Sequence, residues 1–270
     1  MDYSSDIVSQ VLLQSLIEGP LLLGNLPEAT TFDHQTLTLP QETISLNLQQ
    51  KLGHLYEDSL TLLLENTPRY HLLTRGLQIR EKSGRTLGEL DFLLRDHISK
   101  QLIHLELAVK FYLAIESEGS LLLPGPDARD NYFRKLEKMR SHQLLLTKKH
   151  LTLLPDEFRK EKIIVQQLVY GCIFNHVNAH QPIKAEFLNP NGRRGKWLHA
   201  SECQSYFGET TQLEIIPKPL WPSPLEILEG IELEKWQPGK TIKRCTMVRA
   251  NTETLPYFIA PDDYPATTEP

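Results

Sequence analysis

The sequence predicts a mixed α/β fold in which a central sheet is flanked by helices, and three observations lead to that prediction. A helical apolar pattern covers about residues 48–64, and strand-like segments joined by short links follow it. A second helical pattern at about 131–149 then precedes a β-branched apolar run at 162–174. The order helix, three strands, helix, strand is typical of a mixed sheet with helices packed against it.

The first core helix follows an N-terminal stretch that combines a short apolar helix pattern, about 7–16, with a turn-rich connection. Within 48–64, leucines and a tyrosine recur at spacings of three and four residues, which places them on one face of a helix. The helix is expected to end at Asn66-Thr67-Pro68, because proline cannot continue a helix and disfavours helical backbone in the residue before it.

Three strands are predicted next, at 72–80, 85–95 and 101–113. Each alternates apolar and polar residues over part of its length, as a strand with two different faces does. The links, Ser83-Gly84 and the polar run 96–100, are short and therefore indicate antiparallel hairpins.

The second core helix has apolar residues on one face and arginines and lysines on the other, and the run 162–174 is interpreted as a buried strand. Beyond residue 179, proline and aromatic residues are frequent, and one strand is predicted near 213–216. The predicted parts are an N-terminal extension (1–45), a core (46–178) and an irregular C-terminal extension packed on the core (179–270), with a disordered-like tail from about residue 260.

Composition limits the class of protein. Hydrophobic residues make up 40% and charged residues 23% of the chain, which suits a globular protein rather than a disordered or collagen-like one. The net charge of −5 does not by itself indicate a nucleic-acid binder. The chain has no apolar run of roughly 18 residues, no positively charged signal segment and no Cys-x-x-Cys pair. We therefore expect a cytoplasmic protein without membrane contact, and the oligomeric state is left open.

The residues that indicate chemistry lie on the second and third predicted strands. Side chains alternate between the faces of a strand, so Glu106 and Lys110 share one face of the third strand. If the two strands pair as a hairpin, Asp91 of the second strand approaches Glu106. Two carboxylates in a partly dry cleft repel each other, and Mg²⁺ or Mn²⁺ with oxygen ligands removes that repulsion. Such a site beside a lysine is typical of phosphodiester hydrolysis.

Other interpretations of these charges compete with a metal site. A solvent-exposed hairpin carries paired charges too, since cross-strand ion pairs stabilise it modestly. The segment 105–113 is otherwise apolar on both faces, which indicates a central strand where charge is costly unless it is used. An unrelated α/β protein with a charged hairpin would have Asp91 and Glu106 diverge. His104 and Glu89 are expected to be surface groups, in preference to groups that support a metal.

With these residues and this order of elements, the chain resembles the PD-(D/E)XK nuclease superfamily, and its RecB-like members in particular. The resemblance rests on Gly88 and Asp91 on one strand, Glu106 and Lys110 on the next, and Gln143 on the following helix. The chain is also similar to a bacterial domain family of unknown function that is itself placed in this superfamily. The segments that carry this similarity are 84–93, 106–113 and 135–144, within a resemblance that covers about residues 50–176.

The resemblance implies a restriction-endonuclease-like core and a metal-dependent nuclease that hydrolyses DNA, in preference to RNA, with Mg²⁺ or Mn²⁺ as cofactor. Asp91 and Glu106 would bind the metal, and Lys110 would assist the attacking water or stabilise the transition state. Gln143 would be a helper on the second core helix, and Glu57 on the first would be a further acidic ligand. A glutamine at a helix edge and an exposed helix carboxylate explain these last two residues equally well.

One position departs from the superfamily pattern. The pattern places an acid two residues before the lysine, where this chain has Ala108, whereas Glu106 lies four residues before Lys110. The strand period keeps Glu106 on the same face but moves it roughly 6–7 Å further along the strand. This departure favours a second interpretation, in which the same fold has lost hydrolysis and serves as a nucleic-acid or protein binding module.

Two groups of basic residues are candidates for phosphate contacts in a nucleic-acid complex. Lys135 and Lys138 lie on the second core helix. Arg193, Arg194 and Lys196 lie in a glycine-containing segment that ends at a tryptophan, whose ring can stack on a base. Each group is also explained by an ordinary solvated charged surface.

Overall fold

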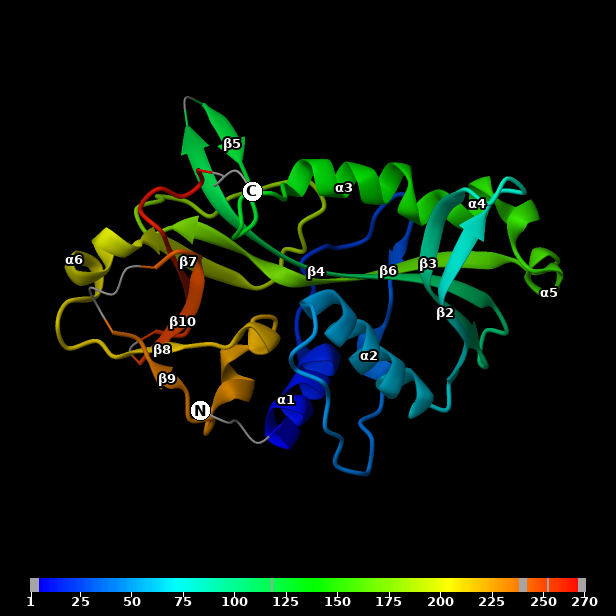
Figure 1. Ribbon diagram of the computed structural model, residues 1–270, viewed down its shortest axis with the longest axis horizontal. Helices are drawn as coiled ribbons and strands as arrows, with labels where there is room; N and C mark the ends of the chain where they lie inside the picture. The colour runs from blue at the N-terminus through cyan, green and yellow to red at the C-terminus, as the bar shows by residue number, and fades with distance from the viewer. Residues whose placement is uncertain (1–4, 118, 238–241, 252, 267–270) are drawn as a thin grey trace.

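A large mixed β-sheet runs through the molecule, and helices cover both of its faces in the computed structural model (Figure 1). The structure describes residues 5–117, 119–237, 242–251 and 253–266. Its strands are β1 (Thr30–Thr31), β2 (Tyr70–Arg80), β3 (Thr86–Asp96), β4 (Leu102–Ser117), β5 (Ser120–Leu122), β6 (Ile163–His176), β7 (Arg194–His199), β8 (Leu213–Ile215), β9 (Glu234–Lys235), β10 (Thr246–Ala250) and β11 (Pro256–Ala260). Its α-helices are α1 (Ser5–Glu18), α2 (Leu52–Glu65), α3 (Tyr132–Ser141), α4 (Leu146–Lys149), α5 (Asp156–Arg159) and α6 (Cys203–Phe207). Its 3-10 helices are η1 (His34–Thr36), η2 (Gln143–Leu145), η3 (Leu151–Leu153), η4 (Ala200–Glu202), η5 (Lys218–Leu220) and η6 (Leu225–Leu228).

The strands follow one another across the sheet in the order β2-β3-β4-β6-β7-β11-β10-β8-β9, with β1 beside β6 and β5 beside β4. Strands β2, β3 and β4 form antiparallel hairpins. Strands β4, β6, β7 and β11 run parallel to their neighbours in that series. The predicted mixed α/β fold with a central sheet and flanking helices is therefore confirmed.

The two faces of β4 contact different helices. Leu107 and Val109 pack in the cluster that α1 and α2 form with the sheet, whereas Ala108 and Tyr112 pack in the cluster that contains α3. In Figure 1, α3 lies on one side of β4 and β6, and α1 and α2 lie on the other. Because side chains alternate along a strand, Glu106 shares the α3 side of the sheet with Ala108.

The N-terminal residues belong to the same core, which differs from the extension expected for 1–45. Leu12 and Leu16 of α1 are buried against Leu60 of α2, because the apolar stripe of each helix removes that of the other from water. Strand β1 adds a parallel pairing to β6. The segment before α2 therefore completes the core.

The single helix expected over 131–149 is interrupted. Helix α3 ends at Ser141, and His142, with φ −128° and ψ −69°, is not helical. The chain then forms η2 and α4, which brings Leu146 onto β3. A Cβ atom on Gly88 would lie 2.7 Å from the methyl carbons of Leu146, so a larger residue there would force the Leu146 side chain to shift.

The region beyond residue 179 differs most from its prediction. Instead of one strand in an irregular extension, five strands, β7 to β11, continue the central sheet. All residues of β11 are buried. The strand pairs in parallel with β7, and because β7 is distant in sequence, no hairpin pattern predicts this pairing. Tyr264, in the predicted tail, is buried and donates a hydrogen bond to the Gly125 carbonyl at 3.0 Å, while 267–270 lie outside the described residues.

Two further expectations concern cysteines and membranes. Cys172, Cys203 and Cys245 are buried and form no disulfide, and burial raises the pKa of the Cys172 thiol to about 12. None of the helices within the described ranges is long and apolar enough to span a membrane.

Candidate functional site

Two carboxylates lie at the point where strands β3 and β4 separate. The strands pair in register as far as Phe92 and Leu105. Beyond that pair, the backbone N–H of Leu107 donates to Oδ2 of Asp91 at 2.9 Å, and the N–H of Asp91 lies 3.5 Å from Oε1 of Glu106. Each carboxylate thus reaches the backbone of the opposite strand. The two acids converge, and the alternative in which they diverge is wrong.

The backbone of β3 is irregular at Asp91. The ladder to β2 omits Asp91 and its opposite residue Gly76, whose φ of +65° favours glycine. Phe92 packs on the α2 side of the sheet, whereas Leu90 packs against Leu146 of α4. A regular strand would place Leu90 and Phe92 on one face, so the irregularity turns the strand at the residue that carries the carboxylate.

Two side chains hold Glu106, and a third side chain contacts one of these two. It is 2% exposed, and its Oε1 lies 2.7 Å from Nε2 of His104. Gln143 of η2 donates from Nε2 to Oε2 of Glu106 at 3.3 Å, and Thr147 of α4 lies 3.5 Å from Nδ1 of His104. His104 is fully buried, contrary to the surface position expected for it, because β4 is central in the sheet and α4 covers this face.

Burial and a neighbouring charge act together on Asp91. Burial raises the pKa of Asp91 to about 8, and repulsion from Glu106 acts in the same direction. The hydrogen bond from Leu107 lowers this pKa, and the charges of Glu57 and Glu89 raise it further. Without a cation, Asp91 therefore keeps its proton near neutral pH, and a bound cation would favour release of that proton.

Lys110 is further along β4, and its ammonium is engaged by an acid that sequence reasoning missed. Its Nζ donates to Oδ2 of Asp130 at 2.8 Å, and no bond to Glu106 is formed. Asp130 directly precedes Asn131, whose side chain caps α3. The sequence marks Asp130 only as part of a helix start, and the loop that brings it to Lys110 has no periodic signal.

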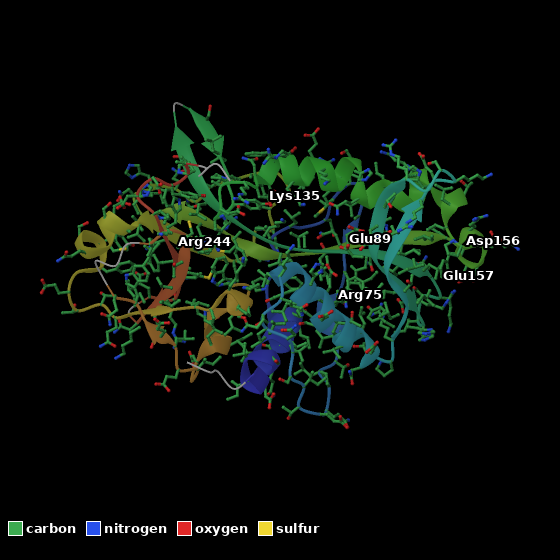
Figure 2. All side chains as sticks on the ribbon, in the orientation of Figure 1. Arg75, Glu89, Lys135, Asp156, Glu157 and Arg244 are labelled. Carbon is green, nitrogen blue, oxygen red and sulfur yellow. The ribbon has the colours of Figure 1, made fainter. Side chains whose placement is uncertain are left out.

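Lys135 on α3 lies close to this ion pair. Burial and the charge of Lys110 lower the pKa of Lys135, whereas Asp130 and Asp91 raise it. Figure 2 labels Lys135 on α3 and Glu89 on β3, the strand beside β4 in the sheet. Glu89 is exposed, as expected, and accepts a hydrogen bond from Gln78.

Strand β6 approaches β4 closely beside Lys110. Gly171 is the register partner of Lys110 and has φ +143°. A Cβ atom at this position would lie 1.6 Å from the carbonyl oxygen of Lys110. The backbone that carries Lys110 therefore depends on a glycine in the neighbouring strand.

Glu57 belongs to α2, on the other side of the sheet from α3. Its Oε2 accepts a hydrogen bond from Nη2 of Arg75 at 3.0 Å, and Arg75 also contacts Asp58 at 2.5 Å. Arg75 is labelled on this side in Figure 2. Glu57 thus acts on Asp91 through its charge, while its carboxylate is engaged by an arginine.

The structure separates the two groups of basic residues. Lys138 is exposed on α3 and lies near Lys135. Lys196 on β7 donates to the Tyr206 hydroxyl at 3.0 Å, and Arg193 donates to the carbonyl of Trp221 at 2.7 Å. Arg194 acts through its charge on the Tyr132 hydroxyl of α3 and, together with Arg193, on the buried thiol of Cys172. Among the described residues of the two groups, Lys135 is the one on which the charge of Asp91 acts.

The oxygen atoms available to a metal are those of Asp91, Glu106 and Gln143. Across the described ranges, no group of three or more His, Cys, Asp or Glu side chains is arranged to hold a metal. However, Oε1 of Gln143 is buried and has no hydrogen-bond partner, while Nε2 of the same amide bonds Glu106. Hard cations accept amide oxygens beside carboxylates, so this donor set fits Mg²⁺ or Mn²⁺.

The fold and the site define a mixed α/β protein with one buried and one partly buried carboxylate where two strands of its sheet separate. The family DUF1853, Domain of unknown function (DUF1853), matches residues 26–260, and the chain belongs to this family. The match extends through β11, so the C-terminal strands are part of the family's domain. No curated protein and no solved structure matches the chain.

Proposed function

We propose that this protein is a metal-dependent nuclease with a restriction-endonuclease-like core, acting on DNA in preference to RNA. The observation that carries the proposal is the partly buried Asp91 beside the buried Glu106, with no lysine or arginine bonded to either carboxylate among the described residues. Two buried carboxylates without a cation are unfavourable, because desolvation and repulsion both penalise their charged forms. A divalent ion removes that penalty.

Residues of the chain supply both the ligands for such an ion and the positive charge beside it. Asp91 and Glu106 supply carboxylate oxygens, and Gln143 supplies the amide oxygen that has no other partner. The ion, when bound, polarises a phosphate and lowers the pKa of a water molecule. Lys110 and Lys135 place positive charge beside these ligands, where it stabilises the negative charge that develops on phosphate.

Two residues position the others. The hydrogen bond from Nε2 of His104 fixes the orientation of Glu106, as groups behind metal ligands commonly do. Asp130 holds the ammonium of Lys110 by a 2.8 Å ion pair. A nucleic-acid strand lying along α3 would have its phosphates within reach of Lys135 and Lys138.

A second function, a nucleic-acid or protein binding module without hydrolysis, is favoured by a different observation. Ala108 stands where the superfamily pattern has an acid, and the ammonium of Lys110 is engaged by Asp130. Both oxygens of Glu106 also have hydrogen-bond partners. A surface satisfied in this way can bind without catalysing a reaction.

The two functions are separated by a cleavage assay on the purified chain. Single- and double-stranded DNA and RNA are incubated with Mg²⁺ or Mn²⁺, with and without a chelator, beside an Asp91→Asn variant. A Glu116→Gln variant is the matched control, because Glu116 is an exposed carboxylate on β4, the strand that carries Glu106, and is not among the charges that act on Asp91. We expect cleavage that requires metal, persists in Glu116→Gln and is lost in Asp91→Asn.

Cleavage that survives in Asp91→Asn would show that the carboxylate pair is not the active site. Absence of cleavage in the folded wild-type protein, together with retained nucleic-acid binding, would instead establish the binding module. Binding is measured in the same preparations by fluorescence anisotropy of labelled oligonucleotides.

A further inference from the structure

Arg193 differs from the other arginines that pack into the structure. Six arginines in the described ranges form ion pairs with carboxylates: Arg69, Arg75, Arg95, Arg140, Arg159 and Arg249. Arg193 has no carboxylate at that distance in the same ranges, and its Nη1 donates to the carbonyl of Trp221 at 2.7 Å. Its Nη2 is enclosed and has no hydrogen-bond partner. An enclosed guanidinium without an anion is unfavourable and indicates a missing partner.

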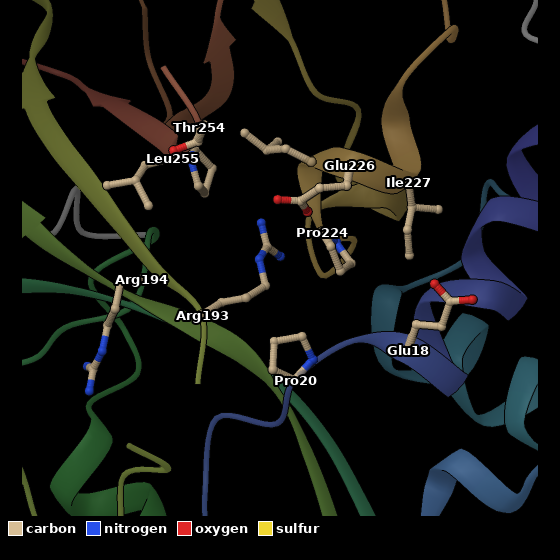
Figure 3. A pocket seen from close by; sticks show the side chains of 11 residues that line it. Glu18, Pro20, Arg193, Arg194, Pro224, Glu226, Ile227, Thr254 and Leu255 are labelled. Atoms are coloured by element: carbon tan, nitrogen blue, oxygen red, sulfur yellow. The ribbon is translucent and has the colours of Figure 1, made fainter. Parts of the chain in front are cut away.

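Arg193 lies in a pocket of about 410 Å³ on the α1 side of the sheet. Four segments form it: the end of α1, the residues before β7, the segment around η6 and the turn before β11. Figure 3 shows the side chain of Arg193 extending into the pocket, with Arg194 turned away from it. The volume falls within the roughly 300–1,000 Å³ typical of small-molecule sites.

The lining combines both signs of charge with an apolar wall. Glu18 and Glu226 are exposed and form no ion pair with Arg193, although Figure 3 shows Glu226 pointing toward it. The apolar wall consists of Pro20, Pro224, Leu225, Ile227, Leu255 and Pro256. A simple anion would bind the guanidinium of Arg193 but would be repelled by the two glutamates. A ligand with one negative and one positive group pairs with the arginine and with the glutamates.

We propose that this pocket binds a zwitterionic amino acid or short peptide with an apolar side chain. The ligand carboxylate binds the guanidinium of Arg193 through a charge-assisted hydrogen bond. The ligand ammonium lies toward Glu226 and Glu18, and the apolar side chain contacts the prolines. The proposal does not depend on nuclease activity, since the pocket and the carboxylate pair lie on opposite sides of the sheet.

The charge of Arg193 also reaches a buried tyrosine that does not line the pocket. The hydroxyl of Tyr56 on α2 is buried without a hydrogen-bond partner and lies within electrostatic range of Arg193. Burial lowers the pKa of Arg193, but a guanidinium stays charged at neutral pH. The charge that a ligand carboxylate would meet is therefore present.

The test is isothermal titration calorimetry of the full chain with L-leucine and with the dipeptide leucyl-leucine. Each probe is compared with its N-acetyl form, which lacks the ammonium, and with its C-terminal amide, which lacks the carboxylate. Glu226→Gln and Arg193→Gln remove one charge each, and Glu229→Gln is the control because Glu229 is exposed outside the pocket lining. Circular dichroism confirms that each variant is folded.

We expect at least one free probe to bind saturably, with about tenfold or greater weakening for both capped forms and for Glu226→Gln. The Glu229→Gln and Asp91→Asn variants should bind as the wild type does. Equal binding of an N-acetyl probe would overturn the zwitterion in favour of a simple anion. No binding of either free probe at about 10 mM would overturn the site. If Arg193→Gln does not fold, the capped probes and the Glu226→Gln variant still test whether the pocket recognises the carboxylate and the ammonium of the ligand.

Discussion

The two sides of the sheet bury charge of opposite sign in different ways. On the α3 side, Asp91 and Glu106 share hydrogen bonds from a backbone amide, a histidine and a glutamine. On the α1 side, the guanidinium of Arg193 has a single carbonyl as its hydrogen-bond partner. Hydrogen bonds replace the water that the carboxylates lose but leave their mutual repulsion. Arg193 has one such bond and forms no ion pair within the described ranges, although the charge of Glu226 acts on it.

This difference indicates what each site needs. The carboxylate pair has its donors in place and lacks only a cation, so a small ion completes it. Arg193 lacks an acceptor and lies in a space large enough for an organic molecule. The unpaired negative charge of the carboxylates indicates a site for a metal ion. The unpaired positive charge of Arg193, beside a larger space, indicates a site for an organic ligand.

The largest expected effect is a loss of cleavage in a variant of the carboxylate pair that leaves binding in the α1-side pocket unchanged. Glu106→Gln keeps the size of the side chain but removes one negative charge from the pair, so we expect metal-dependent cleavage to fall about 10³-fold or more. Binding of the zwitterion on the α1 side should be unchanged in the same variant. Single-turnover cleavage rates and calorimetry on one preparation measure both, and a joint loss would mean that the variant disturbs the fold.

The pH dependence of stability tests the charge state of the carboxylate pair. The pKa of Asp91 is about 8 in the folded protein, against 3.8 for an ordinary aspartate. A raised carboxyl pKa contributes stability that is complete at low pH and is lost as pH rises from the unfolded value through the folded one. For metal-free protein we therefore expect this contribution to the unfolding free energy to fall by about 1 kcal/mol per pH unit between those values.

Urea unfolding with a chelator, at several pH values from about 4 to about 8, measures this slope. Other carboxylates also titrate at the acidic end, so the quantity to compare is the difference between wild type and Asp91→Asn. If Asp91 has an ordinary pKa, the wild type and Asp91→Asn should show the same slope of unfolding free energy against pH. Added Mg²⁺ should recover wild-type stability mainly at the alkaline end, where both carboxylates are charged.

Stability also distinguishes the unpaired arginine from a paired one. Arg193→Met removes an enclosed charge that forms no ion pair with any described residue, so we expect the unfolding free energy to rise by about 1 kcal/mol. Arg75→Met removes the partner of Glu57 and Asp58 and should lower it by up to about 1 kcal/mol. Urea denaturation without ligand measures both, and a strong loss of stability in Arg193→Met would mark Arg193 as a structural group.

The smallest expected effect concerns nucleic-acid affinity. Lys135→Gln removes one phosphate contact on the α3 side, so we expect weaker binding and a salt dependence whose slope falls by about 0.7–0.9. Lys218→Gln, an exposed lysine on η5 that lies on the α1 side, should leave both unchanged. Anisotropy titrations at several salt concentrations compare the variants, and equal effects would indicate non-specific binding over the whole surface.

How far the site was predictable depends on the distance in sequence between its parts. Asp91 and Glu106 lie on adjacent strands with a short link, so strand alternation and hairpin pairing bring them together. Lys110 was placed on the right face, but its bond to Asp130 was missed because a loop without periodicity carries that acid. His104 was expected at the surface, since a polar residue in a strand does not reveal which helix will cover it.

The fold shows the same limit at larger scale. The strands from Tyr70 to Ser117 are linked by short turns, and local patterns located each of them. Strand β11 lies between β7 and β10, and its parallel pairing to β7 leaves no mark in the local sequence. The break in the second core helix at His142 was missed for a related reason. After the break, Leu146 contacts Gly88 of β3, and helical periodicity does not reveal a contact between such distant segments.

The sequence by itself determined the class of fold, the order of the elements between α2 and β6, and the meeting of two carboxylates across a hairpin. These follow from periodicity and short links, which are local properties of the chain. The tertiary structure alone decided that His104 and Gln143 hold Glu106, that Asp130 engages Lys110, and that four distant segments enclose Arg193. Burial and pairing of charge depend on which surfaces pack together, and that is settled only when the whole sheet and its helices are assembled.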